Sequence, residues 1–474
     1  MTAPKREHLH LLGIGGTGMT ALAGLLHKAG YRVTGSDNAL YPPTSVVLEQ
    51  LGLEVFTGYH PANLEPAPDL VVVGNALSRG NPELEEVLDR QLPYMSMPQV
   101  IAQRFLAGRH SMVVSGTHGK TTTSSMLAAT LHRAGRDPGF LIGGAPFDFD
   151  APFRLGGGEE FVIEGDEYDT AFFDKGPKFM HYRPDTVLLG AVEFDHIDIY
   201  DDLEHVKTAF RRLINLIPRR GLLVCHVDGD VVQELADGAF CRVQGYGIER
   251  GMWRAAEIEE TEAGVRYRVL RDGSSFLGLQ LGVSGVHNVL NSLSVVAAAA
   301  DRGLGPDAIR AGLEGFAGVR RRLENRGDYD GVLVLDDFAH HPTAISNTLQ
   351  AVRRRYPQRR LWVVLEPRSW SMRRNVFQER LGESFDDADR VIIAGVYGAD
   401  ALPKNERLDP HRLVAELSAR GSQARFVPRV EEITNLLAGE AEPGDVIVVM
   451  SNGGFDGLID RLVTRLQARQ ARAC

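Results

Sequence analysis

The sequence predicts an α/β protein with mostly parallel sheets, divided into three blocks. Short apolar segments typical of strands alternate with helical segments of period 3.6, which is the pattern of βα units. A chain of 474 residues is also too long for one hydrophobic core. In each block, polar and glycine-rich residues follow the strands, and open α/β sheets bind ligands beyond the carboxyl ends of their strands. The pattern therefore predicts three ligand crevices, or ligands shared where the blocks face one another.

The expected elements follow this division. The first block has a helix at 20–29 and strands at 8–12, 31–35 and 70–74. The second block begins near residue 109 and has strands at 112–115, 161–164 and 186–192. The third begins after residue 323, with strands at 331–335, 361–365, 390–394 and 445–450. Between the last two blocks, residues 253–281 alternate polar and apolar side chains like antiparallel strands, and residues 297–300 fall in an apolar helix.

Composition excludes several classes of protein. Hydrophobic residues make up 43% of the chain and charged residues 24%, which is typical of a soluble globular protein. A net charge of −10 without a basic block argues against nucleic acid as the main partner. Three scattered cysteines are too few for a disulfide framework or a zinc site. Neither a signal peptide nor an apolar stretch of membrane-spanning length is expected, so the cytoplasm is the expected location.

The segment Gly116-Thr-His-Gly-Lys-Thr121 follows an apolar strand and opens a helix. Glycines let backbone wrap closely around phosphates, and the N–H groups of a helix start attract anions. Lys120 would reach the β- and γ-phosphates of a nucleoside triphosphate, and the Thr121 hydroxyl would bind Mg²⁺. Val114 stands where the usual motif has its first glycine, so a plain glycine-containing turn is the alternative.

Two acidic segments follow strands of the same block. Glu164-Gly-Asp-Glu-Tyr-Asp169 provides a carboxylate where a phosphate-loop protein places a Mg²⁺ ligand, with a solvated acidic turn as the alternative. Glu193-Phe-Asp-His-Ile-Asp198 has a histidine, His196, among acids. His196 would bind a second Mg²⁺ or orient a substrate.

The first block contains Gly13-Ile-Gly-Gly-Thr-Gly18 between a strand and a helix, with Asp37 at the end of the next strand. This spacing matches a dinucleotide-binding motif whose acid binds a ribose hydroxyl. The same geometry serves any nucleoside diphosphate, because the helix N-terminus recognises the pyrophosphate. A nicotinamide-dependent oxidoreductase and a tight turn without ligand are the alternatives.

Further polar residues suggest nucleotide and carboxylate contacts. Asn288 and Asn291 suit a purine edge or a phosphate, although an N-cap role fits them nearly as well. Asp337 would bind a ribose hydroxyl, and Arg368 would pair with a carboxylate. Residues 320–322 place three arginines at an apparent hinge, where they would meet a transferring phosphoryl group or simply line a solvated linker.

Taken together, these motifs resemble the Mur ligase family of bacterial cell-wall synthesis. The phosphate loop, Glu164, the segment 195–198, the residues 287–291 and the segment 337–342 occur in the order of that family, over nearly the whole chain. The resemblance implies a UDP-sugar-binding Rossmann-like domain at 1–107, a central P-loop ATPase domain at 108–318 and a C-terminal Rossmann-like domain at 319–474.

The resemblance also assigns site residues. Lys120, Glu164 and His196 are the implied catalytic residues, and Thr121, Glu164 and His196 the implied metal ligands. The implied ATP contacts are Gly116, Thr117, His118, Gly119, Lys120, Thr121, Thr122, His287, Asn288, Asn291, Arg321, Asp337 and His341. The implied UDP-sugar contacts are Gly13, Gly15, Gly16, Thr17, Gly18, Met19 and Asp37. The implied contacts of the amine acceptor are Arg368, Ser369 and Asn452.

The N-terminal glycine motif resembles the muramate-binding branch of the family, which has two kinds of member. One joins UDP-N-acetylmuramate to L-alanine, and the other joins it to the recycled tripeptide L-alanyl-γ-D-glutamyl-meso-diaminopimelate. Long stretches resemble the second kind, at 41–45, 74–82, 166–175, 366–369 and 451–455. The implied reaction is ATP- and Mg²⁺-dependent amide formation through an acyl phosphate, in peptidoglycan recycling. The implied partners are these small molecules, without nucleic acid, membrane or an obligate protein partner.

Overall fold

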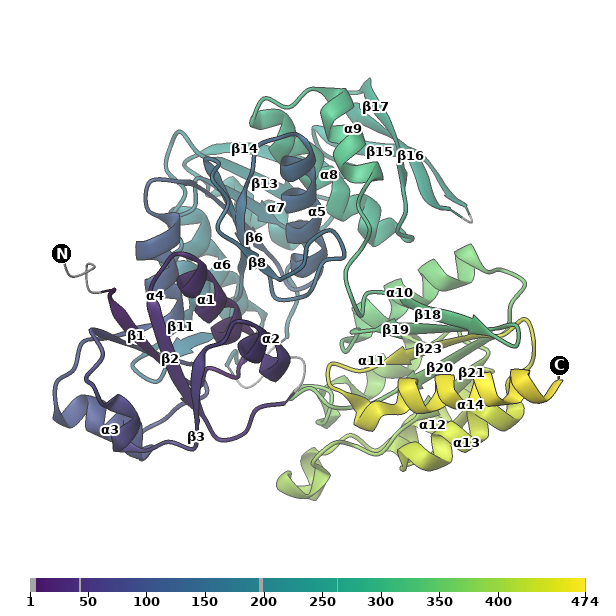
Figure 1. Ribbon diagram of the computed structural model, residues 1–474. Coiled ribbons are helices and arrows are strands. Elements are labelled where there is room, and N and C mark those ends of the chain that lie inside the picture. The colour runs from purple at the N-terminus through teal and green to yellow at the C-terminus, as the bar shows by residue number, and fades with distance from the viewer. Residues whose placement is uncertain (1–5, 42–43, 196–198, 262, 474) are drawn as a thin grey trace.

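The computed structural model describes residues 6–41, 44–195, 199–261 and 263–473. It confirms the α/β class: three large sheets follow one another along the chain, and most of their strand pairs are parallel. In Figure 1 the N-terminal sheet lies at the lower left, the central sheet above it and the C-terminal sheet at the lower right. Among the described residues, no helix is both long and apolar enough to cross a membrane.

The N-terminal sheet has five parallel strands. Their spatial order is β3 (Glu54–Thr57), β2 (Arg32–Asp37), β1 (His8–Leu12), β4 (Leu70–Val73) and β5 (Tyr94–Ser96). Leu9 and Leu11 of β1 pack with the apolar face of α1, whereas Leu12 packs on the opposite face near α3. The helices are α1 (Thr17–Lys28), α2 (Thr44–Gln50), η1 (Pro61–Leu64), α3 (Pro82–Asp89), α4 (Met97–Ile101) and the π-helical η2 (Ala102–Leu106).

The central sheet has ten strands. Their order is β17 (Ser274–Leu281), β16 (Gly264–Arg271), β15 (Trp253–Thr261), β14 (Arg242–Gly247), β13 (Leu222–His226), β12 (Thr186–Leu189), β6 (His110–Ser115), β9 (Glu160–Gly165), β7 (Gly139–Leu141) and β8 (Phe153–Arg154). The antiparallel pairing of β15, β16 and β17 confirms the expectation for residues 253–281. A two-stranded hairpin, β10 (Asp169–Ala171) and β11 (Asp174–Pro177), stands apart from this sheet.

Helices cover both faces of the central sheet. Val114 of β6 and Leu188 of β12 pack with α5 and α8, and the neighbouring residues Val113 and Val187 point to the other face, toward α6. This alternation is the period of two that a strand imposes. The helices are α5 (Lys120–Arg133), η3 (Lys178–His181), α6 (Leu203–Asn215), α7 (Asp230–Asp237), α8 (Val286–Asp301) and α9 (Pro306–Glu314).

The C-terminal sheet has six strands. Their order is β18 (Glu324–Tyr329), β19 (Val332–Asp337), β23 (Val446–Met450), β20 (Leu361–Leu365), β21 (Arg390–Ile393) and β22 (Gln423–Phe426), and only the β18–β19 pair is antiparallel. Leu335 faces α10, and Val334 faces α14. The helices are α10 (Pro342–Arg355), η4 (Asn375–Phe377), α11 (Gln378–Glu383), η5 (Ala399–Ala401), η6 (Lys404–Glu406), α12 (Pro410–Ala419), α13 (Val430–Glu440), η7 (Phe455–Gly457) and α14 (Leu458–Ala473).

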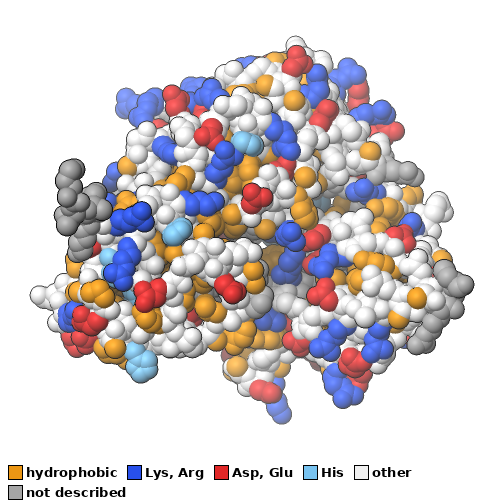
Figure 2. Space-filling model, in the orientation of Figure 1, with side chains coloured by type: hydrophobic (Ala, Val, Ile, Leu, Met, Phe, Trp, Pro, Cys, Tyr) orange, Lys and Arg blue, Asp and Glu red, His pale blue; other side chains and the backbone are white. Residues whose placement is uncertain are grey.

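The carboxyl ends of strands from the central and C-terminal sheets meet across the molecule. Thr343 of α10 donates a hydrogen bond to Glu193, which follows β12, at 2.7 Å. Ser371 donates to Asp195 at 3.0 Å. Figure 2 shows charged side chains of both signs gathered near the centre of the drawn face, where the parts of the chain meet. The ring of His118 in the phosphate loop is 4.7 Å from that of His341, so this loop faces the C-terminal part of the chain.

The strand predicted at 186–192 is three residues shorter than expected. β12 ends at Leu189, although the apolar run continues to Val192. The segment after it runs along the phosphate loop instead: Gly190 donates to the Ser115 carbonyl at 2.9 Å, and Thr117 donates its N–H to the Ala191 carbonyl at 2.8 Å. This tertiary contact overrides the local preference for strand.

Candidate functional site: a phosphate loop facing the C-terminal domain

The loop between β6 and α5 has the backbone of a phosphate-binding turn. Gly116 has a φ of +128° and Gly119 a φ of +80°, both in the region that side chains disfavour. A Cβ on Gly116 would lie 3.1 Å from backbone atoms of residues 190 and 191, and one on Gly119 would lie 2.5 Å from Asn291 Oδ1. The first turn of α5 begins at Lys120, so its free N–H groups point to the space that the loop encloses. Asn291 lies directly against this loop.

Lys120 is held by a carboxylate that the sequence did not single out. Its ammonium donates to the Gly116 carbonyl at 2.7 Å and to the two carboxylate oxygens of Glu167 at 3.0 and 2.9 Å. Glu167 is only 2% exposed. Burial alone would lower the pKa of Lys120, but Glu167 and Asp166 outweigh it and raise that pKa. The lysine therefore stays charged, and Glu167 is its counter-ion.

Thr121 and Glu164 lie side by side beneath the loop. The Thr121 hydroxyl donates to Glu164 Oε2 at 3.2 Å, and Gly143 donates its N–H to Oε1 at 2.7 Å. Burial raises the pKa of Glu164 in spite of Lys120 nearby, so the carboxylate lacks full charge compensation. A hydroxyl and an under-compensated carboxylate are oxygen ligands that Mg²⁺ prefers, and these two residues fit a Mg²⁺ site. His196, the third expected ligand, lies outside the described residues.

The start of α8 faces the same loop. The helix begins at Val286 with Gly285 as its N-cap, so neither Asn288 nor Asn291 has the N-cap role. Asn291 donates to Asn288 Oδ1 at 3.2 Å. Burial, with Arg322 nearby, lowers the pKa of His287 to about 4, which keeps its ring neutral.

The hinge arginines have different surroundings. Arg321 donates to the carbonyls of Ser451 and Gly453 at 2.5 and 2.7 Å and stacks on Phe338, within the C-terminal part of the chain. Arg322 lies over the same Phe338 ring, and it also lines a cavity of about 430 Å³ together with Asn288, between the central and C-terminal parts. Burial lowers its pKa, with Asp337 and Glu164 acting in the opposite direction. Arg322 is thus the one of these two arginines that lines this cavity, and the implied ATP contact at Arg321 stays a prediction.

Asp337 ends β19 and is buried at 4% exposure. Its carboxylate accepts the N–H groups of Leu323 and Ala339, both at 2.8 Å. Burial raises its pKa, although Arg322 and these N–H groups act against the rise. Asp337 thus ties the hinge to the end of β19.

The glycine-rich loop of the N-terminal sheet lies at the carboxyl ends of β1 and β2. Gly15 donates its N–H to Asp37 Oδ2 at 2.9 Å, and Tyr59 donates its hydroxyl to Oδ1 at 3.4 Å. Gly16 is the N-cap of α1, and Gly16 and Thr17 are exposed. Gly18 packs against Met97, and Met19 is buried in the core. The structure therefore brings together the expected glycines and Asp37, and adds Tyr59, which the sequence analysis missed.

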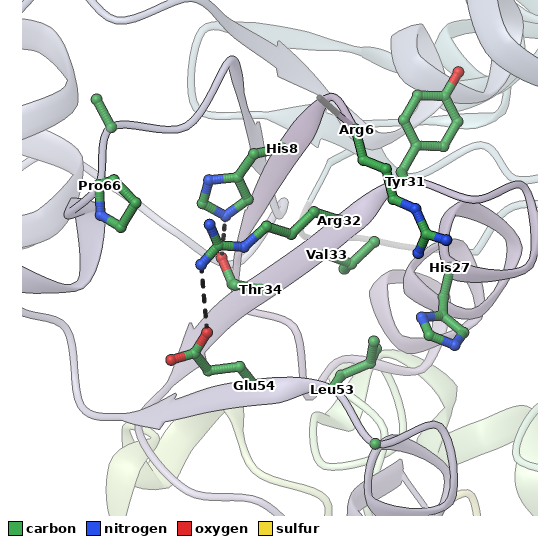
Figure 3. Close-up of a pocket in the computed structure, with 12 residues that line it drawn as sticks. Arg6, His8, His27, Tyr31, Arg32, Val33, Thr34, Leu53, Glu54 and Pro66 are labelled. Carbon is green, nitrogen blue, oxygen red and sulfur yellow. Dashed lines mark hydrogen bonds and ion pairs between the residues drawn. The ribbon is translucent and has the colours of Figure 1, made fainter. Parts of the chain in front are cut away.

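A different cavity of this sheet has no predicted site residue. It measures about 550 Å³ and is lined by Arg6, His8, Tyr31, Arg32 and Glu54, among others (Figure 3). Arg32 and Glu54 are the first residues of β2 and β3, so the cavity opens at the amino ends of these strands. It is therefore at the opposite end of the sheet from the glycine-rich loop.

The expected acceptor residues cluster beyond the ends of β20 and β23. Arg368 stacks on Tyr397 at 3.7 Å from the ring centre and lies 3.4 Å from Glu366. Gly453 packs on the Arg368 side chain so closely that a Cβ there would lie 2.1 Å from Arg368 Nε. The neighbouring Asn452 has a buried Oδ1 without a hydrogen-bond partner in the described part of the chain. The Ser369 hydroxyl accepts the Met372 N–H at 3.2 Å, at the start of the turn that follows.

Family models match the chain over most of its length. Residues 8–109 match the Mur ligase family catalytic domain, residues 114–299 the Mur ligase middle domain, and residues 321–453 the Mur ligase glutamate ligase domain.

Individual relatives match nearly end to end. UDP-N-acetylmuramate–L-alanyl-γ-D-glutamyl-meso-2,6-diaminoheptandioate ligase of Escherichia coli is 41% identical over 98% of this chain and 99% of its own. UDP-N-acetylmuramate–L-alanine ligase of Acetivibrio thermocellus is 34% identical over 95% of this chain and 94% of its own.

Solved structures agree with these matches. A murein peptide ligase from Psychrobacter arcticus superposes with a TM-score of 0.74 at 38% identity, covering 97% of this chain and 99% of its own. UDP-N-acetylmuramate–alanine ligase from Thermotoga maritima superposes with a TM-score of 0.81 at 25% identity, covering 98% and 99%. With three family models and full-length relatives in agreement, the chain belongs to the Mur ligase family.

Proposed function

We propose that this enzyme joins UDP-N-acetylmuramate to the tripeptide L-alanyl-γ-D-glutamyl-meso-diaminopimelate in an ATP-dependent reaction. The observation that carries the proposal is the phosphate loop, in which Lys120 donates to the Gly116 carbonyl and Thr121 donates to Glu164, in a chain 41% identical to a ligase named for these substrates. A soluble enzyme of peptidoglycan recycling in the cytoplasm, acting on small molecules, is consistent with this reaction.

Chemically, a free carboxylate is a poor acyl donor, so its oxygen must first become a leaving group. The lactoyl carboxylate oxygen attacks the γ-phosphorus of ATP, the bond to the β-phosphate oxygen breaks, and an acyl phosphate and ADP form. The alanine amine of the tripeptide then attacks the acyl carbon. The C–O bond to phosphate breaks, the amine loses a proton, and an amide and inorganic phosphate result.

The residues of the phosphate loop would act on the first step. Lys120 would exchange Glu167 for the β- and γ-phosphates and stabilise the charge that moves during transfer. The N–H groups at the start of α5 would bind the remaining phosphate oxygens. Mg²⁺, when bound by Thr121 and Glu164, supplies charge neutralisation at the phosphates. Arg322, next to the implied contact Arg321, would approach the nucleotide from the C-terminal part.

The three parts of the chain would divide the substrates. Residues 1–107 would bind the UDP-sugar through Gly13 to Met19 and Asp37, with Tyr59 as a further contact. Residues 108–318 would bind ATP, together with His287, Asn288 and Asn291 of α8. Residues 319–474 would close over ATP through Asp337 and His341 and would present the acceptor.

Sequence identity and structural similarity favour different acceptors. Sequence identity is higher to the tripeptide ligase of Escherichia coli, at 41%, than to the L-alanine ligase of Acetivibrio thermocellus, at 34%. The TM-score is higher for the alanine ligase from Thermotoga maritima, at 0.81 against 0.74. A whole-chain TM-score is sensitive to how domains are oriented, whereas identity reflects the side chains that recognise a substrate. Identity therefore favours the tripeptide.

Arg368, Ser369 and Asn452 are the proposed acceptor contacts. Arg368 is partly exposed, with a planar guanidinium held against Tyr397, and such a group pairs well with a carboxylate. The tripeptide has three carboxylates, whereas L-alanine has one. A fixed arginine at this position is thus better matched to the tripeptide.

The test is ADP release from ATP and Mg²⁺ with UDP-N-acetylmuramate, comparing the tripeptide with L-alanine as acceptor. Turnover that requires the tripeptide supports the proposal. Turnover with L-alanine alone would show that the enzyme is of the kind that adds L-alanine. If neither acceptor supports turnover, the ligase proposal is refuted. A nicotinamide-dependent oxidoreductase, the remaining alternative for the glycine-rich loop, would change the absorbance of NADH and leave ATP intact.

A further inference from the structure

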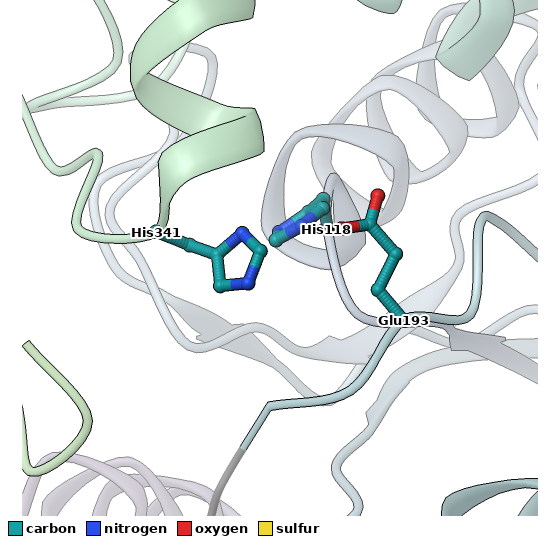
Figure 4. Close-up of side chains that lie close together, drawn as sticks. All are labelled: His118, Glu193 and His341. Atoms are coloured by element: carbon teal, nitrogen blue, oxygen red, sulfur yellow. Dashed lines mark ion pairs between the residues drawn. The ribbon is translucent and has the colours of Figure 1, made fainter. Parts of the chain in front are cut away.

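Three side chains between the phosphate loop and α10 direct their ligating atoms to one small space. One ring nitrogen of His118, one of His341 and one carboxylate oxygen of Glu193 lie within 4.8 Å of one another. The two rings are 4.7 Å apart between centres, and His118 Nε2 is 3.7 Å from Glu193 Oε2 (Figure 4). We propose that His118, Glu193 and His341 bind a divalent transition-metal ion of the Zn²⁺ class in the nucleotide-free enzyme.

The strongest support is a pair of buried nitrogens that have no hydrogen bond. The Nε2 atoms of His118 and His341 are both inaccessible to solvent, and neither has a hydrogen-bond partner among the described residues. His341 is only 2% exposed. Buried polar atoms in folded proteins nearly always have a hydrogen-bond partner, so two nitrogens without hydrogen bonds in neighbouring rings indicate a missing ligand. A metal ion would satisfy both rings at once.

The donor set selects the kind of ion. Two imidazoles and one carboxylate suit Zn²⁺, Co²⁺ or Ni²⁺, whereas Mg²⁺ and Ca²⁺ prefer oxygen ligands. With metal–ligand distances near 2.0 Å, ligating atoms in a tetrahedral site are about 3.3 Å apart. The distance of 3.7 Å between His118 and Glu193 is close to this value, and side-chain rotations would close the set, whose atoms lie within 4.8 Å of one another. Three protein ligands leave a fourth position for water.

Neighbouring groups fix the carboxylate. The Thr343 hydroxyl donates to Glu193 Oε2 at 2.7 Å, and the Glu193 N–H donates to the Thr117 hydroxyl at 2.8 Å. Such second contacts orient metal ligands in known sites. Arg380 is 3.9 Å from the same Glu193 oxygen, so its guanidinium would compete weakly with a metal ion for this carboxylate. His341 Nδ1 accepts the Thr343 N–H at a long 3.3 Å. A neutral ring that binds a metal through Nε2 has its proton on Nδ1, so metal binding would cost this one bond.

The site would connect two parts of the chain. His118 belongs to the phosphate loop and Glu193 to the segment after β12, whereas His341 is the N-cap of α10 in the C-terminal part. A bound ion would hold α10 against the phosphate loop. The nucleotide phosphates are proposed to enter at this loop, so the ion and the nucleotide would exclude each other. By linkage each would weaken the other's affinity by the same factor. Only this exclusion depends on the proposed function.

The test uses the full-length, metal-free enzyme without nucleotide or Mg²⁺. Co²⁺ is added and its visible absorption followed, and Zn²⁺ is measured by calorimetry. We expect one ion per chain, with His341→Ala and Glu193→Gln each weakening binding at least about 100-fold, since even outer contacts of a metal ligand are worth 10- to 100-fold. His411→Ala, which removes an exposed histidine on α12, is the matched control and should leave binding unchanged.

Several results would overturn the site: weak Co²⁺ binding, equal binding by all variants, or equal loss in the His411→Ala control. Unfolding curves of each variant without metal distinguish a lost ligand from a misfolded chain, and Glu193→Gln preserves the side-chain shape. Added ADP should raise the apparent Kd for Co²⁺, and no effect of ADP would refute mutual exclusion. Because ion binding is measured without substrates, its failure would leave the ligase proposal untouched, and the reverse also holds.

Discussion

Lys120 and Glu167 form a buried ion pair inside the phosphate loop, with the ammonium 2.9 and 3.0 Å from the two carboxylate oxygens. A nucleotide must therefore displace a carboxylate to reach this lysine. Replacing Lys120 with Met should lower ADP release at least about 100-fold, because a donor to the transferring phosphoryl group is lost. Steady-state assays at saturating ATP measure this loss. Near-normal turnover by Lys120→Met would show that the loop does not bind the reacting phosphates.

The same variant has a consequence for stability. Removing Lys120 leaves the Glu167 carboxylate buried without its cation, which typically costs about 3 kcal/mol. The double variant Lys120→Met/Glu167→Gln should recover most of this loss in urea unfolding and none of the lost activity. If the single and double variants are equally stable, the pair does not contribute to stability as this geometry requires.

Thr121→Val should raise the Mg²⁺ concentration needed for half-maximal activity by roughly 10-fold. The change removes one oxygen ligand and the 3.2 Å contact with Glu164, and it preserves the shape of the side chain. Mg²⁺ titrations of ADP release provide the measurement. Thr208→Val, on the exposed side of α6, is the matched control and should leave the Mg²⁺ requirement unaltered.

Arg368→Lys should raise the KM for the tripeptide about 10-fold and change the KM for ATP by less than about 2-fold. Lysine preserves the charge but loses the planar group that stacks on Tyr397 and pairs with a carboxylate through two hydrogen bonds. Arg412→Lys on α12 serves as control, since that arginine pairs with Glu416 at the surface. Equal changes in the KM values of all three substrates would argue against a specific acceptor contact.

Acid should destabilise the protein through His287. Its pKa falls from its usual 6.5 to about 4 in the folded state, because burial and Arg322 disfavour the charged ring. Between these pH values the unfolded chain binds the additional proton, so stability decreases as pH falls from about 6.5 toward 4. The contribution is on the order of 3 kcal/mol. Urea unfolding at several pH values should show a flatter decline for His287→Gln, and an unchanged slope would refute this assignment.

The sequence by itself determined the phosphate loop, the glycine-rich loop and the antiparallel segment at 253–281. Each is encoded by contiguous residues: positive φ at Gly116 and Gly119 and the start of α5 are local properties of a strand–turn–helix. Apolar strands such as β20 were likewise predicted with their observed bounds, because burial on both faces makes them continuous apolar runs.

Tertiary structure alone decided which groups meet at these loops. Glu167, which lies between β9 and β10, contacts Lys120. Thr343 contacts Glu193 across the interface of two sheets. Arg322 lines the cavity between the central and C-terminal parts, and the strand expected to reach Val192 ends at Leu189 along the phosphate loop. Local sequence patterns define the face of a strand or the start of a helix. They do not encode contacts between distant segments, which depend on how the sheets pack against one another.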